Sequence, residues 1–302
     1  MYVDSCKSNL SIVKNFSISE IERFTGIKAH TIRTWEQRFG IVKPLRTKAL
    51  TRHYSLTELE EILNLSVLNR NGYKISRLAL LSPQEIKHQL AQVTDTEIKH
   101  QKTIADLTIL MHSFDVAAFE NLLAESFKCW PSSAVFYYII YPFLKMHELL
   151  WQGNKLTEEH LVVTVLRSKM IHATEVLKPD NNQDRTVILF LHTTKQLDLA
   201  LLYVSFHLKN AGIKVIYLGS DVSVDNLEHL FQKVKPQLLY TYLPDKNNFE
   251  FKKLIRLLEG QSNECKLIMS THSQRLNPVA DSDKIIQLKF EEALNYLLSI
   301  DI

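Results

Sequence analysis

The sequence predicts a multidomain protein with α and α/β parts: a winged helix-turn-helix, then a helical bundle, then a flavodoxin-like parallel sheet. Three observations support this prediction. A basic segment with a proline break, HTIRTWEQRFGIVKPLRTKALTRHYS, starts at His30 and follows a short helix. The middle of the chain repeats apolar residues at helical spacing. The last third alternates short apolar runs with helical stretches, which is typical of parallel sheets covered on both faces.

The composition excludes several protein classes. The chain has 302 residues, of which 45% are hydrophobic and 23% charged, and this length allows two or three globular domains. The longest apolar run, AVFYYIIYPFL, is too short to span a membrane and is broken by Pro142. The first residues have no signal-peptide core, and the three cysteines show no metal-ligand spacing. We therefore expect a cytoplasmic protein without a membrane partner or a metal site.

The charge is unevenly distributed along the chain. Residues 1–82 contain 13 Lys and Arg against 7 Asp and Glu, whereas the remaining residues contain 23 against 26. A basic N-terminal part on a mildly acidic body favours a polyanion as the partner of the N-terminal part alone.

Two short helices are expected at the start of the first domain. The sequence SISE at Ser17 is a capping box, and the helix that it starts ends at Gly26. A second helix begins near Ala29 and ends at Gly40, which completes a helix-turn-helix. The helical period places two sets of residues on opposite faces of the second helix. The apolar set is Ile32, Trp35 and Phe39, and the polar set is His30, Arg33, Thr34 and Gln37.

The next segment predicts a β-ribbon wing, because it contains Pro44 and alternates basic and apolar residues. Ser55 then starts a third helix with the capping box SLTE, and this helix ends at Asn71-Gly72. A further short helix is expected at 75–81.

The bundle and the α/β part follow. From Ser82 to about Pro179 the pattern is helical, with the capping boxes SPQE and TDTE, and it predicts four or five helices. The runs TVILFLH, IKVIYLG, LLYTYL, KLIMS and KIIQL then predict five strands separated by helices, as in flavodoxin-like domains. We expect a flexible tail at 1–14, the DNA-binding domain at 15–82, the bundle at 83–178 and the α/β domain at 185–302.

The N-terminal segment resembles the DNA-binding domain of the MerR family. Six short pieces match in order and spacing: Thr25-Gly26, Ile32-Arg33, Trp35-Glu36, Arg38-Phe39-Gly40, Pro44-x-Arg46-Thr47 and Arg52-x-Tyr54-Ser55. The resemblance implies that the chain binds double-stranded promoter DNA, at least as a dimer on paired half-sites.

Roles can be assigned to the polar residues of this segment. Side chains early in a recognition helix reach base edges, and arginines hold phosphates. We expect base contacts from His30, Thr31, Thr34 and Gln37, and phosphate contacts from Arg33 and Arg38. The resemblance implies backbone contacts from the wing residues Arg46, Arg52 and Tyr54. Trp35 is expected in the core, and Glu36 is expected to pair with an arginine.

The rest of the chain resembles the cobalamin-dependent, light-responsive repressors of the MerR family. In that subgroup a histidine after the first strand binds cobalt, a serine follows the third strand, and two glycines follow the fourth. Here these positions fall on Leu197, Thr241, Ser270 and Thr271. Leucine offers no donor atom to a metal, and side chains at the glycine positions would crowd the nucleotide tail.

The bundle retains more of that subgroup's pattern, because Trp151, Glu159 and His160 match the element that covers the upper face of the cofactor. Trp151 can equally be a core residue, and Glu159 and His160 can equally form the first turn of a helix. His192 and His207 are weak alternatives as a cobalt ligand. We therefore expect a domain that keeps the cobalamin-binding fold without the cofactor.

The predicted function is that of a sequence-specific DNA-binding transcriptional regulator without cobalamin. The alternatives are a cobalamin-dependent light-responsive repressor, and a regulator that senses another small molecule or a partner protein through its α/β domain. An enzyme or corrinoid carrier is disfavoured because no Gly-rich phosphate loop and no nucleophile–base pair is present. A redox sensor based on Cys129 is disfavoured because a lone cysteine is more often a buried apolar residue.

Overall fold

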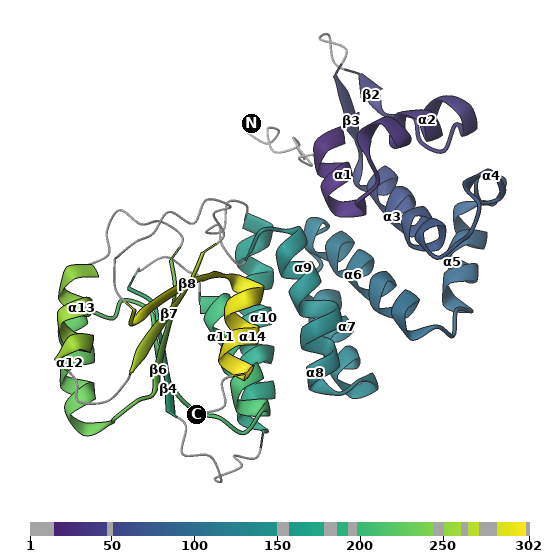
Figure 1. Ribbon diagram of the computed structural model, residues 1–302. Coiled ribbons are helices and arrows are strands. Elements are labelled where there is room, and N and C mark those ends of the chain that lie inside the picture. The colour runs from purple at the N-terminus through teal and green to yellow at the C-terminus, as the bar shows by residue number, and fades with distance from the viewer. Residues whose placement is uncertain are drawn as a thin grey trace, which may run out of the picture. The chain divides into compact units, whose positions relative to one another are not determined.

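The computed structural model describes residues 15–46, 51–149, 157–177, 186–192, 198–243, 251–260, 265–271 and 283–299 (Figure 1). The chain divides into two compact units, Met1–Leu122 and Leu123–Ile302. Helix α7 (Val116–Cys129) runs across this division. The three-domain boundaries expected from the sequence remain a prediction, and the expected tail at 1–14 and linker at 178–185 lie outside the described residues.

The first unit contains the expected helix-turn-helix with its wing. Its elements are β1 (Phe16–Ser17), α1 (Ile18–Thr25), α2 (Ala29–Phe39), β2 (Leu45–Arg46), β3 (Arg52–Tyr54), α3 (Leu56–Arg70), α4 (Ile75–Leu78), α5 (Pro83–Ala91) and α6 (Thr96–His112). The three strands form one antiparallel sheet in the order β1-β3-β2. Helix α3 contacts α1, α4, α5 and α6, so it forms the centre of this unit's core.

Helix caps explain where most of these helices begin. The predicted capping boxes at Ser17, Ser55 and Ser82 are confirmed, since each serine bonds the third residue of its helix and receives that residue's carboxylate in return. The capping box predicted from TDTE is wrong. The cap of α6 is Asp95, one residue later, and its carboxylate accepts from the backbone N–H groups of Glu97 and Ile98. A carboxylate at this place also interacts favourably with the helix dipole.

Four helical elements of the second unit precede its sheet in the chain. They are α8 (Ser132–Val135), the π-helical turn η1 (Phe136–Ile140), α9 (Tyr141–Met146) and α10 (Thr157–Glu175). In η1 the backbone N–H of Tyr141 bonds the carbonyl of Phe136, five residues back. Pro142 follows directly and has no N–H to donate, so the wider turn accommodates it inside a continuous helical segment.

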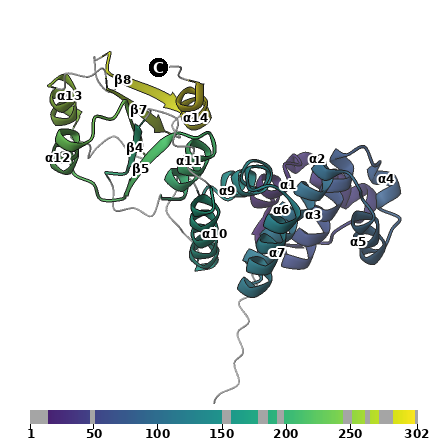
Figure 2. The ribbon, with the colours of Figure 1, turned by 90° about the horizontal axis from the view of Figure 1, so that it is seen from below.

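Five parallel strands form the predicted flavodoxin-like sheet in the order β5-β4-β6-β7-β8. The elements in chain order are β4 (Thr186–Phe190), α11 (Asp198–Asn210), β5 (Lys214–Gly219), α12 (Val224–Lys233), β6 (Leu238–Tyr242), α13 (Phe251–Glu259), β7 (Lys266–Thr271), β8 (Ile285–Lys289) and α14 (Phe290–Ser299). Helices α12 and α13 cover one face of the sheet, and α11 and α14 cover the other (Figures 1 and 2). The predicted fold class is confirmed.

Two further findings bear on the sequence analysis. In the part of the chain that the structure describes, no helix combines the length and the apolar character needed to cross a bilayer. Cys129 is exposed at the end of α7, so the interpretation of this residue as a buried apolar one is wrong.

Candidate nucleic-acid interface

The turn between α1 and α2 is fixed by Gly26 and Glu22. Gly26 adopts φ +63°, and its N–H bonds the carbonyl of Glu22 at 2.7 Å. The carboxylate of Glu22 accepts from the backbone N–H of Ala29 at 3.0 Å and from the ammonium of Lys28 at 3.1 Å. The bond from Lys28 and then that from Ala29 lower the pKa of Glu22. This residue therefore holds the start of α2, a role that the sequence analysis missed.

Helix α2 presents the two faces that the helical period predicts. Ile32 and Trp35 are buried in the first unit's core, whereas His30, Arg33 and Gln37 are exposed. The remaining candidates on this helix are accessible to different degrees: Arg38 is exposed, and Thr31 and Thr34 are half-buried. The hydroxyl of Thr34 donates to the carbonyl of His30 at 2.9 Å, which leaves its oxygen available as an acceptor.

Glu36 connects α2 to both strands of the wing. Its carboxylate accepts from Nε of Arg52 at 2.8 Å and from Nη2 of Arg46 at 3.4 Å. The predicted pairing of Glu36 with an arginine is confirmed. The hydrogen bond to Glu36 also raises the pKa of Arg52.

The two wing arginines differ in how much surface they offer to a ligand. The side chain of Arg46 is 52% exposed, whereas that of Arg52 is only 18% exposed. Arg46 can hold Glu36 and still reach a phosphate. Arg52 serves mainly to hold the wing against α2, and little of it is available to DNA.

Tyr54 differs from the expectation that it contacts the DNA backbone. It lies on the central strand β3 opposite Phe16, its side chain is completely buried, and its hydroxyl has no hydrogen-bond partner among the described residues. Burial raises the pKa of Tyr54 to about 12. A phenol in this position cannot reach a phosphate, so we correct the assignment and remove Tyr54 from the set of DNA contacts.

Arg33 and Arg38 form no ion pair with any residue in the described ranges. The guanidinium of Arg38 lies 5.6 Å from the ring centroid of Phe39, which limits where this side chain points. An exposed arginine without a carboxylate partner is suited to a phosphate, because it has no ion pair to give up on binding.

The α/β unit contains only part of the expected cofactor pattern. Ser270 is completely buried, and its hydroxyl lies 2.6 Å from that of Tyr240. Thr271 and Thr241 are buried, and Oγ1 of Thr241 has no hydrogen-bond partner in the described part. Two other expected positions, Trp151 and Leu197, lie outside the described residues. Asp198, the neighbour of Leu197, is bound by Arg167 of α10 at 2.5 and 2.8 Å.

Among the described residues of this unit, the histidines form no group that could hold a metal ion. Glu159 and His160 lie in the first turn of α10, as the structural interpretation of these residues expects. Nδ1 of His192 lies 3.0 Å from the carbonyl of Val222. His207 lies among aromatic rings with Nε2 buried, and burial lowers its pKa to about 4.

The described residues at the strand ends enclose only a small cavity. A cavity of about 210 Å³ lies there, lined by Tyr141, Lys145, Thr271, Lys289, Phe290, Glu291 and Glu292. Its volume is below the usual range for drug-sized ligands, and a corrinoid is much larger than such ligands. Glu291 bonds both the hydroxyl of Tyr141 at 2.6 Å and the ammonium of Lys145 at 2.8 Å.

Comparison with known proteins supports the regulatory assignment. The model of the MerR HTH family regulatory protein matches residues 16–85. The HTH-type transcriptional repressor CarH of Myxococcus xanthus is 24% identical over 237 residues, which are 75% of this chain and 78% of the relative. The HTH-type transcriptional repressor CarA of the same organism is 25% identical over 230 residues, 74% of each chain.

A solved structure supports the fold of the second part of the chain. The monomethylamine corrinoid protein of Methanosarcina barkeri aligns with a TM-score of 0.53 and 18% sequence identity, over 66% of this chain and 98% of that chain. At this identity the likeness concerns the fold alone.

Proposed function

We propose that this chain, a DNA-binding transcriptional regulator of the MerR type, reads promoter DNA with the exposed face of α2 and responds to no cobalamin. The observation that carries the first part is the exposed set His30, Arg33, Gln37 and Arg38 on a helix that Glu36 locks to the wing. A recognition helix held this way presents its side chains to a groove at a fixed angle.

The proposed contacts fall into two groups. His30, Thr31, Thr34 and Gln37 contact base edges, because they lie along the exposed face of α2 and carry both donors and acceptors. Arg33, Arg38 and Arg46 contact phosphates. Arg52 acts through Glu36 and only marginally on DNA directly.

Self-association is a further part of the proposal. One recognition helix reads one half-site, and regulators of this kind reach useful affinity by pairing two. The helical elements of the second unit expose large apolar side chains, including Tyr137 at 59% and Tyr138 at 51%. In this proposal assembly uses this unit and not a coiled coil, and the effector is a small molecule or a partner protein.

Several residues argue against a cobalamin-dependent repressor, the second candidate function. Leu197 has no donor atom for cobalt. Ser270 stands where the light-responsive repressors have a glycine, and the hydroxyl of Ser270 is hydrogen-bonded to that of Tyr240. The observation that favours this candidate is the fold, which is shared with a corrinoid protein. The proposal therefore treats the α/β unit as a retained fold with an altered role.

Selection of bound sequences from random duplex DNA tests the base contacts. The His30→Ala and Gln37→Ala variants should return a changed preference at one or two positions, since one good base contact provides about 1–3 kcal/mol of discrimination. His229→Ala, an exposed histidine on α12, is the matched control. Identical sites from the wild type and both variants would remove α2 from base recognition.

A further inference from the structure

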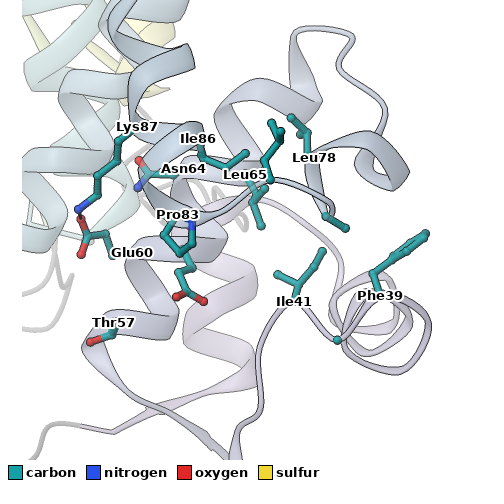
Figure 3. Close-up of a pocket in the computed structure, with 14 residues that line it drawn as sticks. Phe39, Ile41, Thr57, Glu60, Asn64, Leu65, Leu78, Pro83, Ile86 and Lys87 are labelled. Carbon is teal, nitrogen blue, oxygen red and sulfur yellow. Dashed lines mark ion pairs between the residues drawn. The ribbon is translucent and has the colours of Figure 1, made fainter.

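A cavity of about 300 Å³ lies in the first unit, beside the end of the recognition helix (Figure 3). Its walls come from the end of α2 and from α3, α4 and α5. Phe39, Gly40 and Ile41 line it on the α2 side, and Leu65 and Leu78 line it from α3 and α4. This volume is at the lower end of the range for pockets that hold small organic ligands.

Asn64 is the first sign that the cavity is made for a ligand. The residue is 5% exposed, it lines the cavity, and its amide has no hydrogen bond to any described residue. The amide is not among the fully enclosed polar atoms that have no partner, so it faces the open space of the cavity and is available to a molecule bound there. A ligand group that accepts from or donates to this amide would supply the partner.

The carboxylates at the cavity provide the second sign. Glu60 is already bound by the ammonium of Lys87 at 2.8 Å (Figure 3). Glu61 lines the same cavity, is half-buried and has no ion pair with the described residues. Its burial, followed by the nearby charges of Glu58 and Glu60, raises the pKa of Glu61. A cation beside Glu61 would relieve both effects.

We propose that this cavity binds a small organic cation, an ammonium or amidinium carried on one aromatic or branched aliphatic group. The cationic head pairs with Glu61 and hydrogen-bonds the amide oxygen of Asn64. The apolar body packs against Ile41, Leu65 and Leu78. The chemistry follows from one unpaired acid, one unpaired amide and an apolar wall around them.

Occupation of the cavity would change DNA binding, and this step rests on the proposed function of α2. Gly40 ends α2 at φ +64°, and its N–H bonds the carbonyl of Glu36, the residue that holds the wing. A ligand against Phe39 and Gly40 therefore acts on the same helical turn that positions Arg46 and Arg52. By linkage, operator DNA must change the affinity for the cation by the same factor.

Titration calorimetry of the full chain with phenethylammonium, 2-phenylethanol and phenylacetate tests the binding step. We expect saturable one-to-one binding of the cation, and binding of the alcohol weaker by about tenfold or more. Glu61→Gln should weaken binding of the cation by a similar factor and leave the affinity for the alcohol unchanged. Glu228→Gln, an exposed glutamate on α12, is the matched control.

Asn64→Leu provides an independent variant of nearly equal side-chain size. This variant should bind the cation more weakly, and thermal unfolding should show that its chain is still folded. Equal binding of the alcohol and the cation, wild-type binding by a folded Glu61→Gln variant, or no saturable binding of the cation would each overturn the proposed site.

The coupling step is measured separately, as the affinity for a selected operator with and without saturating phenethylammonium. We expect a change of about fivefold or more that is absent in Glu61→Gln. If the cation binds but the operator affinity does not change, the proposed coupling is wrong and the proposed binding site still stands. If the chain binds no DNA at all, the proposed function fails, and the calorimetric result still decides the site.

Discussion

The carboxylate of Glu36 on the recognition helix accepts from Nε of Arg52 on the wing at 2.8 Å, and both side chains are largely buried, at 13% and 18% exposure. This ion pair sets the position of the wing relative to α2. It also leaves little of the Arg52 side chain exposed. A single acidic residue thus decides which arginines of this segment are structural and which are available to a phosphate.

Glu36→Ala should lower the free energy of unfolding of the first unit by about 1–3 kcal/mol, because it leaves the largely buried guanidinium of Arg52 without its carboxylate partner. Denaturant unfolding measures the change. Lys87→Ala is the control within the same unit, because it breaks a more exposed pair with Glu60 and should cost about 0–1 kcal/mol. Equal effects of the two changes would mean that the Glu36 pair does not hold the wing.

Tyr54→Phe should leave DNA affinity unchanged and leave stability unchanged or raise it slightly, because the phenol oxygen is buried without a partner among the described residues. Fluorescence anisotropy with a labelled duplex and thermal unfolding give the two numbers. A loss of affinity at unchanged stability would restore the DNA contact that the family resemblance implies.

His207 should make the second unit sensitive to acid. Burial lowers the pKa of His207 from 6.5 to about 4, so the fold favours the neutral ring. Its stabilising effect is complete above the unfolded pKa of 6.5 and is lost as the pH falls from there through 4. At pH 5 the loss is about 2 kcal/mol.

The variant His207→Phe should lack this loss, because a phenyl ring suits the neighbouring Phe136, Tyr203 and Phe206 and cannot be protonated. His229→Phe on the exposed side of α12 is the control. Unfolding free energies at pH 7 and pH 5 decide the matter, and parallel behaviour of the wild type and His207→Phe would show that another group titrates.

Local signals in the sequence predicted most of the fold and only part of the site. Ser17 and Ser55 marked helix starts because a capping box needs only four consecutive residues. The contact expected from Tyr54 came from the family resemblance, and its burial could not be predicted because a three-residue strand gives too few alternating positions to show which face is buried. The cavity around Asn64 has walls from four separate elements, and no pattern within one segment indicates that they meet.

The purified protein should be colourless, and its DNA binding should be the same in light and in darkness. Leu197 lacks a donor atom, and Ser270 is bonded to Tyr240 where a cofactor tail would need open backbone. An absorption spectrum after incubation with adenosylcobalamin in the dark tests this. Leu197→His alone should not create cobalamin binding. A corrinoid spectrum from the wild type or from this variant would show that the space beside Ser270 can hold the cofactor tail.

The salt dependence of DNA binding tests the central claim, that Arg33 and Arg38 on the exposed face of α2 hold phosphates. Affinity for one duplex is measured over a range of salt concentrations for the wild type, Arg33→Ala/Arg38→Ala and the control Arg256→Ala, an exposed arginine on α13. We predict that the double variant binds every sequence more weakly and that its slope of log K against log salt is shallower by about 2. A slope and affinity equal to those of the wild type and the control would contradict the account.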